Sequence, residues 1–124
     1  MRPFRRYTIL AVAVATLFVS MAASAHAILV DSTPKANGSL PAGHVSFTLK
    51  YNSRIDQARS LLVLVAPDHS ETPLRIIMDS HKPNELDSAA EVKAGAYVIH
   101  WQALALDGHI TRGDVPFTVT VAAP

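Results

Sequence analysis

Apolar and polar residues alternate in several short runs of this chain. In VSFTLKY (45–51), VPFTVTV (115–121) and YVIHWQAL (97–104), every second residue is apolar. A period of two predicts strands with one buried face. The large inward residues should form the core of a small domain, and they are Phe47, Trp101 and Phe117. Pro116 falls on the outward face and has no N–H, so its strand should be at an edge or bulged there.

Other segments complete the expected set of strands. SLLVLVA (60–66) is continuously apolar and is predicted to be a buried strand. LRIIM (74–78) and AILV (27–30) are shorter candidates, and DSHKPNELDS (79–88) is interpreted as the longest polar loop. Turn signals separate the runs: NGS, PAG, PDHS and KAG. About seven short strands without a helical apolar period predict an all-β fold, a Greek-key sandwich or barrel.

The N-terminus has the organisation of a secretory signal. Three arginines precede the apolar run 7–19, and Ala-Ser-Ala at 23–25 is a typical cleavage pattern. We expect residues 1–25 to be removed, which leaves a domain of residues 26–124. An uncleaved anchor and a cut after Ala27 are the alternatives. RRYTIL (5–10) partly resembles a twin-arginine signal, so the sequence leaves the export route open.

Composition narrows the classes of function. Three of the eleven Lys and Arg residues and none of the ten Asp and Glu residues lie in 1–25, so residues 26–124 carry a net charge of about −2. This charge argues against a nucleic-acid partner. The chain has no cysteine, so neither a disulfide nor a thiolate ligand is available. All six histidines lie in residues 26–124.

Cleavage after Ala25 would make His26 the first residue. Its α-amine, with a pKa of about 7.7, and its imidazole could then chelate one metal ion. Nitrogen and oxygen donors in a square arrangement suit Cu(II) best among common divalent ions. The alternative is that His26 is only the solvated first residue after the signal.

A second group of donors lies in ALDGHITRG (105–113). Asp107 and His109 are two residues apart, so an extended backbone would place both side chains on one face. Gly108 between them would allow another segment or an ion to approach closely. Added to the amine and ring of His26, they make a complete tetragonal donor set. The alternative interpretation of Asp-Gly is an ordinary hairpin turn.

The motifs HAILVDSTP, GAYVIHW, ALDGHITRG and VPFTVTV, in this order over residues 26–122, resemble the CopC family of periplasmic copper-binding proteins. The resemblance implies a cupredoxin-like Greek-key β-sandwich in the periplasm. It also implies one Cu(II) ion per chain, bound by His26, Asp107 and His109. A role in copper homeostasis or resistance follows, beside an integral-membrane partner of the CopD type, and we expect a monomer.

Two departures from the family pattern alter the expected copper chemistry. Many members carry FSE where this chain has YNS (51–53), so Ser53 replaces an acid that can lie near copper. Some members bind Cu(I) through a methionine-rich loop, but residues 26–124 contain only Met78. We therefore expect one Cu(II) site and no dedicated Cu(I) site.

Two other functions remain open from the sequence. Copper-dependent polysaccharide monooxygenases also begin with a chelating histidine, although Asp107 would occupy a position that such enzymes leave free. A metal-free Ig-like structural module needs neither His26 nor Asp107. We expect a carrier or buffer of copper and no enzyme. The other histidines are expected at the surface: His44, His69, His81 and His100.

Overall fold

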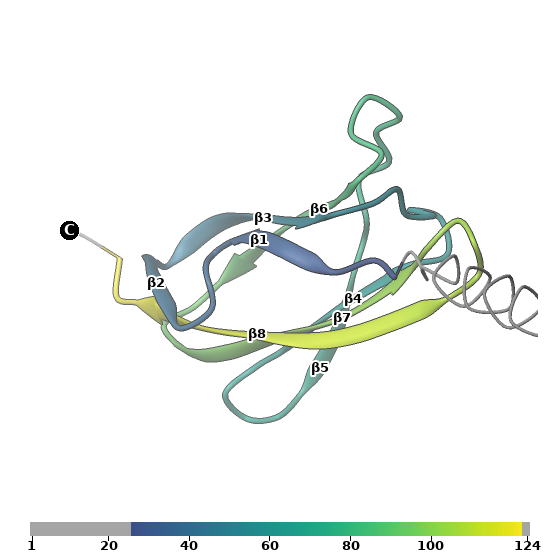
Figure 1. Ribbon diagram of the computed structural model, residues 1–124. Coiled ribbons are helices and arrows are strands. Elements are labelled where there is room, and N and C mark those ends of the chain that lie inside the picture. Colours follow the sequence, from purple (N-terminus) through teal and green to yellow (C-terminus); the bar gives the residue numbers. More distant parts are fainter. Residues whose placement is uncertain (1–25, 123–124) are drawn as a thin grey trace, which may run out of the picture.

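The structure, a computed structural model, describes residues 26–122, and these residues form eight strands. In chain order they are β1 (Leu29–Thr33), β2 (Gly38–Pro41), β3 (Gly43–Tyr51), β4 (Leu61–Val65), β5 (Glu71–Leu74), β6 (Glu85–Val92), β7 (Gly95–Leu104) and β8 (Ile110–Thr120). Figure 1 shows them as two layers packed face to face. The expected all-β sandwich is confirmed, with eight strands in place of about seven.

The two layers are separate hydrogen-bonded sheets. One contains β1-β3-β6, and the other contains β2-β8-β7-β4-β5. All strand pairs are antiparallel except β2 with β8, which run parallel. Because β1 and β2 belong to different sheets, the first segment of the described chain crosses from one layer to the other. The crossing includes a cis bond between Thr33 and Pro34, and Ser32 Oγ donates to the Pro34 carbonyl.

The core lies between the sheets and consists of the alternating residues that the sequence identified. Phe47 from β3 and Phe117 from β8 are 0% and 2% exposed, and their rings meet across the sandwich with centroids 5.8 Å apart. Trp101 is buried as expected. Burial of such side chains is the main stabilising contribution in a domain without disulfides.

Several predicted elements differ from the structure: the candidate strand 27–30 overlaps β1 by two residues, and β8 begins at Ile110, before the predicted run 115–121. Strand β2 occupies residues that were interpreted as turns, and β6 begins inside the predicted polar loop 79–88. Residues 75–78 of LRIIM are not in a strand, because β5 ends at Leu74. The run 60–66 is only half-buried: Leu62 and Leu64 face the core, whereas Leu61 is exposed on the outer face.

Pro116 lies where its chemistry allows. Strand β2 pairs with residues 117–120 of β8, so the part of β8 before Phe117 is an open edge. Pro116 is the last residue of that edge, and its carbonyl accepts a bond from the Asn37 N–H.

Among residues 26–122, no helix is long and apolar enough to cross a membrane. The predicted signal segment 1–25 lies outside the described residues.

Candidate metal centre

The N-terminal segment of the described chain lies in an extended path before β1. Ala27 is 1% exposed and fills a position in the core, whereas its neighbours His26 and Ile28 point outward. The backbone of Ile28 is bonded to Asn52: the Ile28 N–H donates to Asn52 Oδ1 at 2.9 Å, and the Asn52 N–H donates to the Ile28 carbonyl at 3.0 Å. These contacts fix where His26 leaves the sandwich.

The second part of the candidate site is the connection between β7 and β8. Figure 1 shows this connection at the end of the sandwich where the described chain begins. Residues 105–109 form a tight turn closed by a bond from the Ala105 N–H to the His109 carbonyl at 2.8 Å. Gly108 adopts φ 91°, a conformation that favours glycine. The hairpin-turn interpretation of Asp-Gly is therefore correct for the backbone, and the extended one is wrong.

Within this turn, Asp107 and His109 still lie side by side. The Asp107 carboxylate accepts from the His109 backbone N–H at 3.0 Å and lies 2.9 Å from the Nδ1 of the same residue. The backbone N–H bond is the main cause that lowers the pKa of Asp107, and the His109 ring adds to it. Asp107 is therefore an anion at neutral pH, on a surface that is open to solvent.

The structure brings all three predicted ligands together. The imidazole rings of His26 and His109 meet edge to face, with centroids 4.9 Å apart and an interplanar angle of 81°. Asp107 contacts the His109 ring from the other side of the turn. Segments that are far apart in the sequence thus place two imidazoles and one carboxylate at one end of the molecule.

These side chains are near one another without forming a finished site. Within residues 26–122, no three His, Asp or Glu side chains are arranged so that they could already hold a metal ion. Asp107 is directed to its own turn, and it occupies Nδ1 of His109, which leaves Nε2 as the accessible ring nitrogen. In the sequence as given, the nitrogen of His26 is part of a peptide bond to Ala25. Two imidazoles and a carboxylate fit a divalent copper ion chemically.

Sequence reasoning missed Asn52 and Thr111. The Thr111 hydroxyl donates to the Ala27 carbonyl at 2.7 Å, so this side chain also holds the N-terminal segment. Neither contact has a sequence signal, because each joins a polar side chain to the backbone of a distant residue. Ser53, which replaces the acid of the family pattern, has a buried Oγ with no hydrogen-bond partner.

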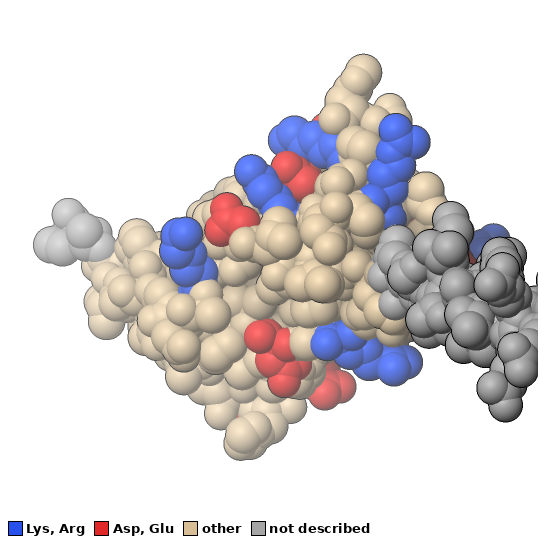
Figure 2. Space-filling model, in the orientation of Figure 1, with Lys and Arg blue, Asp and Glu red and all other residues tan. Residues whose placement is uncertain are grey.

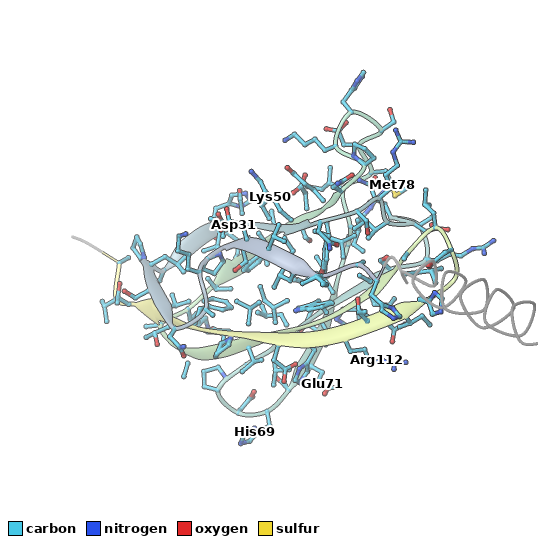
Figure 3. The ribbon with its side chains drawn as sticks, viewed as in Figure 1. Asp31, Lys50, His69, Glu71, Met78 and Arg112 are labelled. Atoms are coloured by element: carbon cyan, nitrogen blue, oxygen red, sulfur yellow. The ribbon has the colours of Figure 1, made fainter. Side chains whose placement is uncertain are left out.

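The remaining histidines are exposed, as expected: His44, His69, His81 and His100. His44 is inside β3 and not in the preceding turn, and it pairs with Glu91 on β6 at 3.0 Å. His100 pairs with Asp114 on the outer face of the five-stranded sheet. Figure 3 shows His69 at the tip of the β4–β5 connection, well away from Met78.

Side chains of both charges occur on the visible surface, most of which is uncharged. Figure 2 shows Lys and Arg side chains interspersed with Asp and Glu on this face of the molecule. Cross-strand pairs such as Lys50 with Glu85, whose charged atoms are 3.9 Å apart, contribute to this mixture. The visible face therefore lacks the basic stripe that is typical of a nucleic-acid interface.

Comparison with known proteins identifies relatives of the whole domain. The chain is 26% identical over 107 residues to Protein YobA of Escherichia coli strain K12, a match that covers 84% of this chain and 86% of the relative. CopC from Methylosinus trichosporium OB3b has a similar structure, with a TM-score of 0.71 and 27% identity over 80% of this chain and 98% of that chain.

A further solved structure shares the fold. PcoC from Escherichia coli, described as a methionine rich copper resistance protein, matches with a TM-score of 0.63 and 24% identity, covering 77% of this chain and all of that chain (100%). The family model for the CopC domain matches residues 29–120, which include every strand of both sheets. This chain therefore belongs to the CopC family.

Proposed function

We propose that the chain beginning at His26 binds one Cu(II) ion and carries or buffers copper in the periplasm. The amine and imidazole of His26, the carboxylate of Asp107 and the imidazole of His109 are the four donors. This set contains three nitrogens and one oxygen, which suits the tetragonal preference of Cu(II).

The observation that carries the proposal is the contact between the rings of His26 and His109, with centroids 4.9 Å apart. Solvated histidines from opposite ends of a domain have no general reason to meet. The neighbouring Asp107 carboxylate, with its lowered pKa, supplies an anionic oxygen beside the pair. Membership in the CopC family supports copper as the metal and the periplasm as the compartment.

Completing the site requires two local changes. Cutting the bond between Ala25 and His26 creates the primary amine, which is the donor missing from the longer chain. Asp107 then exchanges the His109 ring for the metal, and this exchange needs only a side-chain rotation because both groups are exposed. The site is thus completed by processing and by the arrival of the ion.

The decisive experiment compares three chains that differ only at the first nitrogen. One begins at His26, the second begins at His26 with its amine acetylated, and the third begins at Ala25 with the Ala25 amine acetylated. Competition titration and electron paramagnetic resonance should show one tightly bound Cu(II) in the first chain. We expect a loss of affinity of at least about 100-fold in the other two, because a chelate ring is lost.

A matched control uses a histidine outside the proposed site. His69→Ala should leave Cu(II) affinity unchanged, because His69 lies on the β4–β5 connection, whereas His109→Ala should lower it strongly. Equal affinity in the free-amine and acetylated chains would refute the proposed ligand set.

The proposal also assigns one oxidation state. Met78 is the single methionine in residues 26–124 and is 61% exposed, so only one thioether is available to a Cu(I) ion. Titration with Cu(I) under reducing conditions should reveal no second tight equivalent. A CopD-type membrane protein is the proposed recipient, and the proposed role of this chain is non-catalytic.

A further inference from the structure

We infer that Asn52 and Thr111 are positioning residues that hold His26 beside His109. This inference deepens the proposed function, because it explains how a terminal residue becomes part of a defined site. The argument depends on the contacts of residues 26–28, which precede the first strand.

The ladder of β1 does not order these three residues. Regular pairing of β1 with β3 ends at Leu29 opposite Tyr51, and a bulge follows Leu29. A chain end beyond its last ladder bond is normally free to fray. Here the next residues are instead held by Asn52, directly after β3, and by the side chain of Thr111 in β8.

The first tie comes from the three-stranded sheet. Asn52, directly after β3, accepts the Ile28 N–H through Oδ1 at 2.9 Å and returns its own N–H to the Ile28 carbonyl at 3.0 Å. The two bonds make a closed pair, which fixes both the position and the rotation of Ile28. The side-chain bond is the part of this pair that a substitution can remove.

The second tie comes from the five-stranded sheet. Thr111, the second residue of β8, donates its hydroxyl to the Ala27 carbonyl at 2.7 Å. The buried Ala27 methyl group anchors the same residue in the core. The N-terminal segment is therefore held to both layers of the sandwich, immediately before the proposed ligand.

The arrangement restricts where the backbone of His26 can lie. It is one residue from the carbonyl that Thr111 holds, and consecutive Cα atoms are about 3.8 Å apart. The proposed partner His109 is two residues before Thr111 in the chain, so one short segment carries both the tie and the second imidazole. Groups that orient metal ligands typically change metal affinity by about 10–100-fold when they are removed.

The test uses pairs of variants with matched shape. Thr111→Val removes the hydroxyl and keeps the shape, whereas Thr111→Ser keeps the hydroxyl. Thr120→Val is the control, because the Thr120 hydroxyl also donates to a backbone carbonyl, that of Leu40 at 3.3 Å, at the other end of β8. We expect Cu(II) affinity to fall about tenfold or more in Thr111→Val, and to stay near the original value in Thr111→Ser and Thr120→Val.

A second measurement needs no copper. In the metal-free chain, nuclear Overhauser contacts between the ring protons of His26 and His109 should be present. They should be lost in the double variant Asn52→Leu, Thr111→Val, and the Ile28 amide should exchange faster with solvent. Contacts that persist in the double variant would overturn the inference.

The two proposals can fail separately. If the contacts are lost in the double variant but the original chain binds Cu(II) equally well with an acetylated amine, the positioning role stands and the proposed ligand set does not. In a chain that begins at Ala27, Thr111→Val should have no effect on residual copper binding. An effect of the same size there would show that Thr111 acts independently of His26, which overturns the positioning role.

Discussion

At the scale of single residues, the core contains two polar atoms that make no hydrogen bond. The Tyr51 hydroxyl and the Trp101 Nε1 are buried without a partner, and their rings meet edge to face with centroids 5.3 Å apart. A buried polar group without a partner destabilises the folded state by about 1–3 kcal/mol. Each of these two unpartnered groups therefore lowers the stability of the folded state, although the rings themselves are well packed.

Tyr51→Phe should stabilise the protein by up to about 1 kcal/mol, because it removes the unpartnered hydroxyl and keeps the ring. Tyr97→Phe is the matched control with the opposite sign. The Tyr97 hydroxyl donates to the Lys93 carbonyl at 2.9 Å, so its removal should destabilise by about 0.5–1.5 kcal/mol. Urea denaturation of both variants gives the comparison, and a loss of stability in Tyr51→Phe would contradict the prediction.

The same hydroxyl predicts a dependence of stability on alkaline pH. Burial raises the pKa of Tyr51 above its usual value of about 10. Below about pH 10 the hydroxyl is protonated in both states, so it causes no change of stability with pH. Above about pH 10 the unfolded chain releases the phenolic proton while the folded chain keeps it, which favours unfolding. Stability should then fall by about 1.4 kcal/mol per pH unit. In Tyr51→Phe, the decline measured between pH 9 and 11 should be shallower than in the original chain.

Glycine is required at position 113 because the Trp101 ring approaches its Cα closely, and not because of its backbone angles. A methyl group there would lie 2.5 Å from Trp101 Cζ2 and 2.9 Å from Nε1, because the indole packs directly on the glycine. Gly113→Ala should destabilise by about 1–3 kcal/mol through overpacking. It should also shift the emission of Trp101, the single tryptophan. Thr118→Ala, at an exposed position of the same strand, should change stability by less than about 0.5 kcal/mol.

The sequence contains signals for the proposed metal ligands but none for the two residues that hold the N-terminal segment in place. His26, Asp107 and His109 have recognisable motifs, whereas Asn52 and Thr111 act through bonds to backbone atoms 24 and 84 residues away. A polar side chain that bonds to a distant backbone looks the same in a sequence as one that faces water. Only the folded arrangement distinguishes the two.

At the scale of elements, the apolar pattern predicts β3, β4, β7 and β8, whereas β2 and β6 lie in segments whose composition indicates turns and a loop. Strands β3, β7 and β8 have a clear apolar face and contain most of their predicted runs, although β8 begins at Ile110, five residues before the run 115–121. In β6, the inward positions include Ser88, whose hydroxyl is satisfied by the Arg75 carbonyl at 2.6 Å. That bond allows a polar residue to occupy a core position, and the strand therefore lacks the apolar alternation that would have predicted it. Strand β2 has only four residues, too few to show a period.

One side chain makes several bonds to the connection from β5 to β6. Three backbone carbonyls, those of Asp79, Lys82 and Glu85, lie 2.9–3.1 Å from Gln57 Nε2 and share its two N–H groups, and the Gln57 oxygen accepts the Asp79 N–H at 2.9 Å. A single glutamine thus contacts four backbone groups, three of them at Asp79 and Lys82 between the strands and one at Glu85, the first residue of β6. Local order in this segment should depend on it.

Gln57→Leu should loosen residues 79–85 while leaving the sheets intact. We expect faster amide exchange and earlier proteolytic cleavage in that segment, with global stability lower by about 1–3 kcal/mol. Ala58→Ser, at the exposed neighbouring position, is the control and should change neither. Unchanged exchange at Asp79 in the Gln57 variant would show that the four bonds do not order the segment.

At the scale of the whole molecule, stability comes from the core between the sheets. The chain has no cysteine, and its fully buried residues come from both layers, among them Phe47, Leu49, Ile99 and Val119. A core of this kind folds through apolar burial and needs no metal. The metal-free chain should therefore give a cooperative thermal transition in the presence of a chelator.

Copper should then raise the midpoint of that transition in the chain that begins at His26. An ion that binds only the folded state adds about 2.7 kcal/mol at a free concentration 100 times its dissociation constant. The chain that begins at an acetylated Ala25 should show a much smaller shift at the same concentration. Equal shifts, measured by calorimetry, would indicate binding elsewhere on the molecule.

The bond between Thr111 and the Ala27 carbonyl joins residues 84 positions apart and has a consequence for biosynthesis. A polypeptide is made and released from its amino end, so Ala27 emerges long before its partner in the last strand. Pairings of such large separation close late, because the intervening chain must be ordered first. During synthesis, the bond to Ala27 can therefore form only after Thr111 has been made, and a partly synthesised chain lacks this contact beside His26.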